Sequence, residues 1–163
     1  MTMQTRTKKI VALAAVGLLV VVIAFAAVIT MLVRGAESHP PTLTAYSHGE
    51  TVDVPPLQYC NLSLDECDQG SVTELEVPVG SPLQLSLPKD ISAAPWRMII
   101  QYQDANGNEV LEQRSYESGP NSAITIESTD DRQLLVVELQ LPSSVIDEEG
   151  RSIAHAIWSI QTA

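Results

Sequence analysis

The chain has 163 residues, with nine basic and twenty acidic side chains and a formal net charge of −11. Four basic residues lie at or before position 34 and every acidic residue lies after it, so the remaining part carries five basic and twenty acidic residues, a net −15. A surface this negative repels phosphate backbones, which argues against a nucleic-acid-binding role.

The N-terminal region predicts one membrane-spanning helix. Residues 10–33 contain no charged side chain, and at about 1.5 Å rise per residue they form a helix of roughly 36 Å, enough to cross a hydrocarbon core of about 30 Å. Cleaved signal peptides have a shorter apolar region of about 7 to 15 residues. We therefore expect an uncleaved signal anchor, and the alternative is a cleaved signal that is cut near Gly35-Ala36.

The basic residues around this segment predict its orientation. Three precede the apolar run and one follows it closely: Arg6, Lys8, Lys9 and Arg34. Lys and Arg beside a membrane span are retained on the cytoplasmic side. We therefore expect a single-pass protein of the cytoplasmic membrane, with its N-terminus inside and its C-terminal domain on the outer, periplasm-like side.

These observations divide the chain into four parts. They are a short basic cytoplasmic segment, the transmembrane helix, a proline-containing spacer and an extracytoplasmic domain: residues 1–9, 10–33, 34–42 and 43–163. Pro40-Pro41 stiffens the spacer toward extended geometry. The domain is therefore expected close to the membrane.

Beyond the spacer the sequence predicts an all-β domain. Short runs of alternating or β-branched residues recur between turn signals, which is typical of a sandwich or barrel. The runs are residues 43–47, 51–54, 71–79, 83–87, 96–103, 110–116, 124–127, 134–141 and 153–160. We expect an immunoglobulin-like two-sheet sandwich, in architecture only, with Trp96 and Trp158 in its core. No sustained 3.6-residue apolar pattern follows the membrane segment, so helices there are expected to be single turns at most.

Three turn signals subdivide the later strands. Asn106-Gly107 predicts a hairpin between residues 96–103 and 110–116. Pro142 is expected to stop the strand before it, in which Leu135, Val137, Leu139 and Leu141 would share one face. An acidic turn, residues 147–150, precedes the closing strand.

The only two cysteines, Cys60 and Cys67, predict a disulfide. Thiols outside the membrane oxidise, and two cysteines allow one bridge. Their spacing lacks the two-residue gap of redox dithiols, and a zinc site would need two further ligands. His39, His48 and His155 are scattered singly. We expect a structural bridge and no metal site.

Motifs of catalysis are lacking. Residues 104–109 (DANGNE) begin like a calcium loop, but Glu109 and Ser115 stand where that loop needs glycine and glutamate, and a hairpin turn explains the same residues. Neither a nucleophile elbow nor a phosphate-binding or dinucleotide motif occurs. We expect no enzyme activity and no cofactor.

Several short motifs, taken in order, resemble a known family. They are residues 55–60 (PPLQYC), Cys67, residues 94–97 (APWR), 145–150 (VIDEEG) and 156–160 (AIWSI). Over roughly residues 43–161 the chain resembles exported proteins of mycobacteria, corynebacteria and their relatives that are classed only as a domain of unknown function. The resemblance implies a place in the actinobacterial cell envelope and supports a structural cysteine pair, and it supplies no catalytic residues.

The leading functional hypothesis is a non-enzymatic binding or accessory module that contacts other membrane or envelope proteins. The candidate contact residues lie beside the cysteine loop and in the acidic turn: Pro55, Pro56, Leu57, Tyr59, Asp147, Glu148 and Glu149. The loop could equally serve only to close one end of the sandwich. There are two alternatives. One is a sandwich that holds a lipid or glycan in an apolar cavity, and the other is an envelope hydrolase in which carboxylates, or a serine and a histidine, converge in a cleft.

Overall fold

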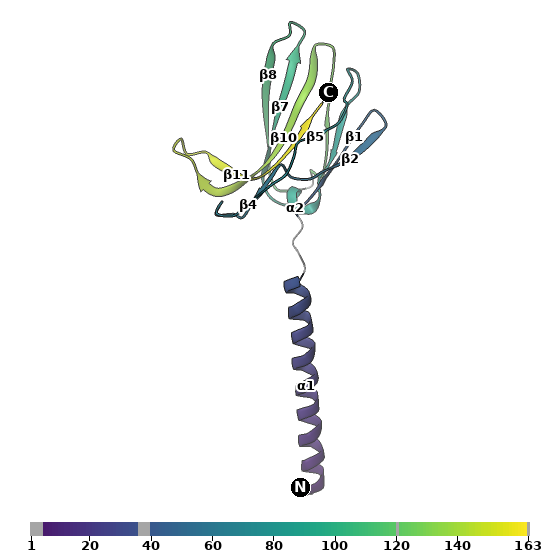
Figure 1. The fold of residues 1–163 in the computed structure, drawn as a ribbon, viewed down its shortest axis with the longest axis vertical. Coiled ribbons are helices and arrows are strands. Elements are labelled where there is room, and N and C mark those ends of the chain that lie inside the picture. The colour runs from purple at the N-terminus through teal and green to yellow at the C-terminus, as the bar shows by residue number, and fades with distance from the viewer. Residues whose placement is uncertain (1–4, 36–39, 120, 163) are drawn as a thin grey trace. The chain divides into compact units, whose positions relative to one another are not determined.

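The computed structural model describes residues 5–35, 40–119 and 121–162 (Figure 1). The chain divides into two compact units between residues 39 and 40. The first contains one long helix, α1 (Thr5–Gly35). Its segment Leu13–Met31 has a mean hydropathy of 2.9, so the helix is long and apolar enough to cross a membrane, as predicted. The hydroxyl of Thr30 donates to the carbonyl oxygen of Ala26 at 2.7 Å, which satisfies this side chain within the helix.

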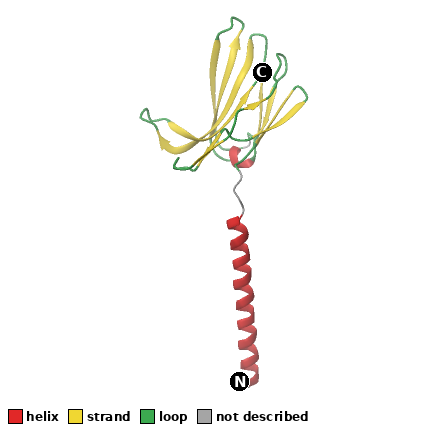
Figure 2. Cartoon of the chain, viewed as in Figure 1, coloured by secondary structure: helices red, strands yellow, loops and turns green. Residues whose placement is uncertain are grey.

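The second unit contains two β-sheets that pack face to face (Figure 2). The small antiparallel sheet has the order β2 (Glu50–Val54), β1 (Leu43–Ser47), β6 (Leu83–Ser86) and β9 (Ala123–Ile126). The large sheet has the order β4 (Cys67–Gln69), β3 (Gln58–Cys60), β11 (Ser152–Gln161), β10 (Arg132–Ile146), β7 (Trp96–Asp104) and β8 (Glu109–Tyr116). A short strand, β5 (Thr73–Glu74), pairs in parallel with β11. The predicted all-β class in two sheets is confirmed.

The core lies between the sheets and follows from the two-residue period of the strands. On β7 the inward residues Trp96, Met98, Ile100 and Tyr102 are at most 3% exposed. Strand β11 contributes Trp158, which is 1% exposed. Alternate side chains of a strand point to opposite faces, so burial of these residues directs their neighbours to the outer face of the large sheet. Both tryptophans occupy the core, as predicted.

The segment predicted as a strand over residues 71–79 is the main departure. Only Thr73–Glu74 forms a strand, because the segment meets β11 along two residues before Pro78 interrupts it. Leu75 and Val77 are nevertheless 2% exposed. Their alternation therefore reflects burial of side chains in a segment that does not continue as a strand. The helix α2 (Lys89–Ser92) is a single turn, within the predicted limit.

The hairpin between β7 and β8 explains residues 104–109. The amide N–H groups of Asn106 and Asn108 donate to one carboxylate oxygen of Asp104 at 2.9 and 2.8 Å, and Gly107 adopts φ +84°. The side-chain amide of Asn108 adds to these bonds and is the largest reason that the pKa of Asp104 lies below its usual value. The carboxylate of Asp104 thus organises the turn.

Candidate binding site

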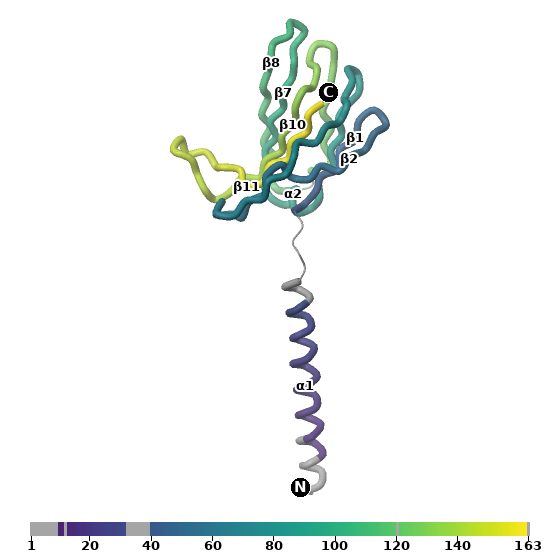
Figure 3. Tube along the Cα trace, in the orientation of Figure 1, coloured from purple at the N-terminus to yellow at the C-terminus, as the bar shows by residue number. Residues whose placement is uncertain are grey.

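A groove of about 500 Å³ lies on the outer face of the large sheet, where the hairpin of β10 and β11 leaves the sandwich. Figure 3 shows this hairpin as a projection from the body of the domain; we call residues 143–153 the arm. The sheet and the arm both line the groove, through Gln58, Arg97, Ile99, Gln113, Gln140, Asp147, Arg151, Ser152, Ile153, Ala154 and Ile157. Its floor is therefore amide-rich and apolar, and its charged groups are two arginines and one aspartate.

Register shifts between β10 and β11 form the base of the arm. Leu141 pairs with Ala156 but Pro142 pairs with Ala154, which leaves one residue of β11 without a partner. Between the next two pairs, three residues of β10 (143–145) lie opposite a single residue of β11, Ile153. Bulges of this kind bend a strand and increase its twist, so the hairpin turns away from the sandwich. The predicted end of the strand at Pro142 is wrong, because proline sits at the shift, where the ladder needs no N–H donor.

Serine side chains hold this irregular segment together. The hydroxyl of Ser152 donates to the carbonyl oxygen of Ser143 at 2.6 Å. The hydroxyl of Ser143 accepts from the N–H of Val145 at 3.0 Å. These bonds replace ladder bonds that the bulge removes. The arm is thus held in its conformation by hydrogen bonds between its own residues.

The acidic turn at the tip of the arm organises itself around Asp147. Its carboxylate accepts from the backbone N–H groups of Glu149 and Arg151 at 3.1 and 2.7 Å, and from the side chain of Arg151 at 2.9 Å. The backbone bond from Arg151 is the main reason that the pKa of Asp147 lies below its usual value. Glu149 also pairs with Arg151 at 3.3 Å. Asp147 and Glu149 therefore have roles inside the turn.

Arg97 lies across the sheet floor on β7 and is half-buried. Its Nε donates to Oε1 of Gln140 at 2.7 Å and one terminal nitrogen donates to the carbonyl oxygen of Ser152 at 3.2 Å. The amide nitrogen of Gln140 donates in turn to Glu138 at 3.2 Å, and Gln140 is only 8% exposed. The guanidinium is therefore held by neutral acceptors in a fixed orientation.

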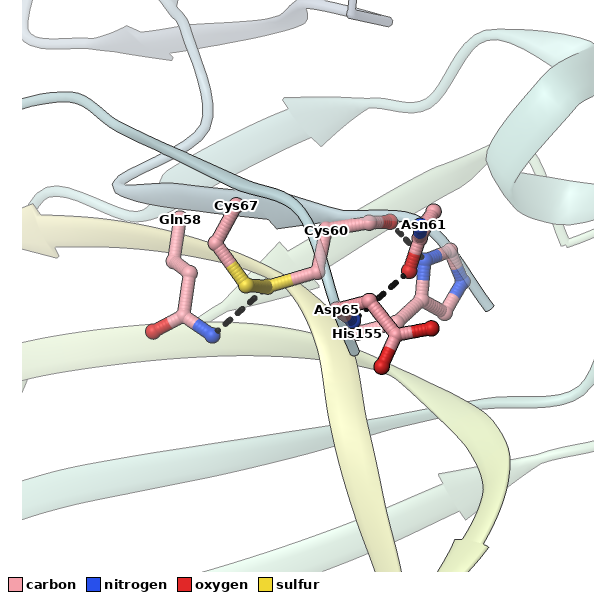
Figure 4. Close-up of a disulfide and its surroundings, with 6 residues drawn as sticks. All are labelled: Gln58, Cys60, Asn61, Asp65, Cys67 and His155. Atoms are coloured by element: carbon pink, nitrogen blue, oxygen red, sulfur yellow. Dashed lines mark hydrogen bonds between the residues drawn. A yellow bond between two sulfur atoms is a disulfide. The ribbon is translucent and has the colours of Figure 1, made fainter. Parts of the chain in front are cut away.

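The predicted disulfide between Cys60 and Cys67 is formed (Figure 4). It joins β3 to β4, and the loop between them is closed by a hydrogen bond from the N–H of Asp65 to the side chain of Asn61 at 3.0 Å. The side-chain amide of Gln58 lies 3.2 Å from the sulfur of Cys60. The bridge thus fixes the strand that contributes Gln58 to the groove.

The proposed contact residues beside this loop differ in accessibility. Pro55 is exposed and Leu57 is half-buried, whereas Pro56 is buried and Tyr59 packs against the core. The N–H of Leu57 donates to the carbonyl oxygen of Ile157 at 2.7 Å. Pro56 and Tyr59 thus hold the segment on the sheet, and Pro55 is the member most open to a partner.

A second cavity of about 360 Å³ lies between the two sheets' edge strands, β8 and β9. Glu112 pairs with Arg114 at 2.6 Å and with Arg132 at 2.5 Å. The Arg132 guanidinium also lies over the ring of Tyr102 at 4.1 Å, and burial raises the pKa of that tyrosine. In this cluster two arginines share one carboxylate, and one of them also contacts an aromatic ring.

Of the seven contact residues predicted from the sequence, Asp147 lines the groove. Gln58, which lies between the predicted residues Leu57 and Tyr59, lines the same groove. The sequence did not identify Arg97, Gln113 or Gln140. Arg97 stands at an outward position of an alternating strand and is one of five basic residues beyond the spacer, a signal that could have marked it.

The histidines do not converge in the part of the chain that the structure describes. The ring Nδ1 of His155 lies 3.2 Å from the carbonyl oxygen of Cys60, and His48 lies near Ser81 at 3.5 Å. His39 lies outside the described residues. Within those residues no three His, Cys, Asp or Glu side chains gather as metal ligands would.

The β domain is similar to known proteins along almost its whole length. The model of a family described as "Protein of unknown function (DUF2771)" matches residues 36–163. Uncharacterized proteins of Mycobacterium tuberculosis (strain H37Rv) and Mycobacterium bovis are each 39% identical to this chain over 139 residues, covering 80% of this chain and 83% of the relative. No solved structure matches the chain.

Proposed function

Given that the chain belongs to the DUF2771 family of proteins of unknown function, we propose its role from its geometry: it is a membrane-anchored binding module of the actinobacterial cell envelope. Helix α1 anchors it in the cytoplasmic membrane, with the N-terminus inside and the β domain outside. The domain acts there as an accessory to another membrane or envelope protein.

The groove beside the arm is the observation that carries this proposal. It combines amide side chains, which both donate and accept hydrogen bonds, with the apolar side chains of Ile99 and Ile157. Large apolar side chains are exposed on the elements that line it: Ile146 and Ile153 on the arm are 66% and 40% exposed, and Leu111 of β8, two residues before Gln113, is 71% exposed. Exposed apolar side chains around a polar groove are typical of protein interaction surfaces.

The charged groups of the groove support binding over catalysis. Asp147 is its one carboxylate among the described lining residues, and both of its oxygens accept hydrogen bonds within the turn. A general acid or base needs a carboxyl group that can reach a substrate proton. The lining supplies positioning groups and no acid–base pair.

A ligand held between the sheets is less well supported. Twenty-one buried residues at most 5% exposed fill the core, and the described grooves lie at the surface. A lipid or glycan would therefore occupy the same groove as a polypeptide. We favour a polypeptide partner because the exposed isoleucines of the arm lie beside side-chain amides of the sheet.

Site-specific crosslinking in native membranes tests this proposal. A photoreactive amino acid replaces Gln113 in the groove, and in a control replaces Thr51 on the edge strand β2 of the small sheet. We expect one defined protein adduct from position 113 and none from position 51. The adduct should disappear when a two-residue turn replaces residues 143–151.

Each failure has a distinct meaning. Equal adducts from positions 113 and 51 would contradict a groove-specific partner. A lipid or glycan adduct from position 113 would replace the polypeptide by the alternative ligand. If the adduct still forms after residues 143–151 are replaced, the arm has no role in binding.

A further inference from the structure

The arginines of the β domain are distributed unevenly. All four of them line one of two cavities: Arg97 and Arg151 line the groove beside the arm, and Arg114 and Arg132 line the cavity between β8 and β9. Three of the four pair with carboxylates of the domain itself. Among the described residues Arg97 alone of these arginines makes no ion pair, although acidic residues outnumber basic ones by fifteen beyond the spacer.

The contacts of Arg97 leave donors for a ligand. A guanidinium has five N–H donors in a planar fork. One is used by the side chain of Gln140 and one by the backbone carbonyl of Ser152. Both acceptors are neutral, so they fix the orientation of the fork without cancelling its charge. The remaining donors are preorganised, which reduces the entropy lost on binding.

The surroundings of Arg97 strengthen its attraction for an anion. Ile99 and Ile157 line the groove next to it, and apolar side chains beside a guanidinium strengthen a charge contact by excluding part of the water around it. The second arginine of the groove, Arg151, is already paired with Asp147 and Glu149. Arg97 is therefore the arginine of the groove that has no direct ion pair, and Glu138 is the carboxylate that it reaches only through Gln140.

We propose that Arg97 is the anchor of a carboxylate-binding site, and that a carboxylate of the partner polypeptide occupies it; this inference rests on the proposed function. The planar fork of arginine matches a carboxylate with two parallel hydrogen bonds. The negative domain repels anions at long range, and this repulsion grows with the charge of the anion. A singly charged carboxylate therefore suits the site better than a doubly charged phosphate.

Salt should affect this site in an unusual direction. The long-range repulsion is screened over about 8 Å at physiological ionic strength, whereas the contact with Arg97 is short and partly desolvated. Moderate salt should thus preserve or raise the association rate of an acidic peptide. A steep loss of association with salt would contradict the charge distribution on which the site depends.

The first test uses acetate as the probe on the full chain in detergent micelles at constant ionic strength. The arginine Nε–H signals are followed by NMR, and the Arg97 signal is assigned by its loss in Arg97→Lys. We expect a saturable shift at Arg97 with acetate, a weaker one with inorganic phosphate and none with acetamide. No shift at Arg97, a similar drift of every arginine signal, or a stronger response to phosphate would overturn the carboxylate assignment.

The second test measures partner affinity by the crosslink at position 113. Arg97→Gln removes one member of a charge pair that would be hydrogen-bonded and buried in the complex. We expect this variant to weaken binding by at least about 30-fold. The matched control Arg132→Gln lies outside the groove and should change affinity by less than about five-fold. Equal affinities in the two variants would overturn the anchor role of Arg97.

The two tests separate failure of this inference from failure of the proposed function. If the crosslink persists in Arg97→Gln and the wild type shows no acetate response, the proposed binding module stands and the carboxylate site is rejected. If acetate shifts the Arg97 signal but no protein adduct forms, the polypeptide partner is rejected and an anion-binding site is supported. The acetate titration uses the wild-type chain, with Arg97→Lys only to assign the signal, so a misfolded Arg97→Gln variant does not prevent a decision.

Discussion

The indole Nε1 of Trp158 donates a hydrogen bond to the carbonyl oxygen of Pro41 at 2.9 Å. This bond connects the closing strand β11 to the second residue of the described part of the β domain. Trp158 is 1% exposed, so the bond lies at the edge of the core. The other core tryptophan, Trp96, stacks on Tyr116 with ring centroids 3.9 Å apart, and its Nε1 has no partner among the described residues.

The two tryptophans should therefore differ on substitution by phenylalanine. Trp158→Phe removes a hydrogen bond and leaves the carbonyl of Pro41 unpaired, whereas Trp96→Phe loses no such bond. We expect the free energy of unfolding to fall by about 1 kcal/mol more in Trp158→Phe. Urea unfolding of both variants, followed by circular dichroism, measures the difference. Equal losses would show that the bond to Pro41 contributes nothing to stability.

The disulfide should contribute stability through the short loop it closes. Replacing both Cys60 and Cys67 by alanine is expected to lower the free energy of unfolding by about 2.5 kcal/mol, from the chain entropy of a loop of eight residues. The fold should persist, because β3 is also paired with β11. The native protein should resist thiol alkylation until it is reduced. Alkylation without a reductant would contradict the bridge.

Gly70 should not tolerate a side chain. A Cβ at this position would lie 2.2 Å from the carbonyl oxygen of Pro56, and the N–H of Gly70 donates to the carbonyl oxygen of Leu57 at 2.8 Å. Gly70→Ala must displace backbone and is expected to destabilise the domain by about 1–3 kcal/mol. Ser71→Ala, at the exposed next position, is the control and should change the melting temperature little. A melting temperature of Gly70→Ala equal to that of the control would show that the backbone yields freely here.

Acid should destabilise the domain partly through Glu112. Hydrogen bonds from Arg132 and Arg114 hold its pKa below the ordinary value of 4.5. A carboxyl group with a lowered pKa in the folded state stabilises the fold above its unfolded pKa, and this contribution is lost as the pH falls below about 4.5 through the folded pKa. Glu112→Gln should therefore be less stable at neutral pH and lose less stability on acidification.

Thermal unfolding across this pH range checks the prediction for Glu112. Glu117→Gln is the matched control, because Glu117 is exposed and makes no ion pair within the described ranges. Its curve should follow that of the wild type. If Glu112→Gln also follows the wild-type curve throughout, the ion pairs at the edge of the sandwich do not govern its acid stability.

Local patterns in the sequence predicted those elements whose side chains divide into apolar and water-exposed faces. The uncharged run gave a helix long enough for a membrane, and alternation placed Trp96 and Trp158 in the core, because burial selects apolar side chains at every second residue. The same reasoning was wrong at Pro142. Proline blocks a strand only where a ladder bond is needed, and the register shift that removes this need involves residues of a different strand.

The groove shows where sequence reasoning stops. From the chain alone, Asp147 was a candidate contact residue, Gln58 was not, and Arg97 was an outward residue of a strand. Whether an arginine meets a carboxylate depends on which strands become neighbours and in which register, and both are set by long-range packing.

The sequence by itself determined a helix long and apolar enough to cross a membrane, the β class, the core tryptophans and the cysteine pair, because each follows from hydrophobicity, periodicity or cysteine count. Only the tertiary structure decided that the arm bends out of the sandwich, that two distant segments line one groove, and that Arg97 faces neutral acceptors there. The physical reason is that these features arise from pairing between β7, β10 and β11, whose residues lie far apart along the chain and meet only when the large sheet forms.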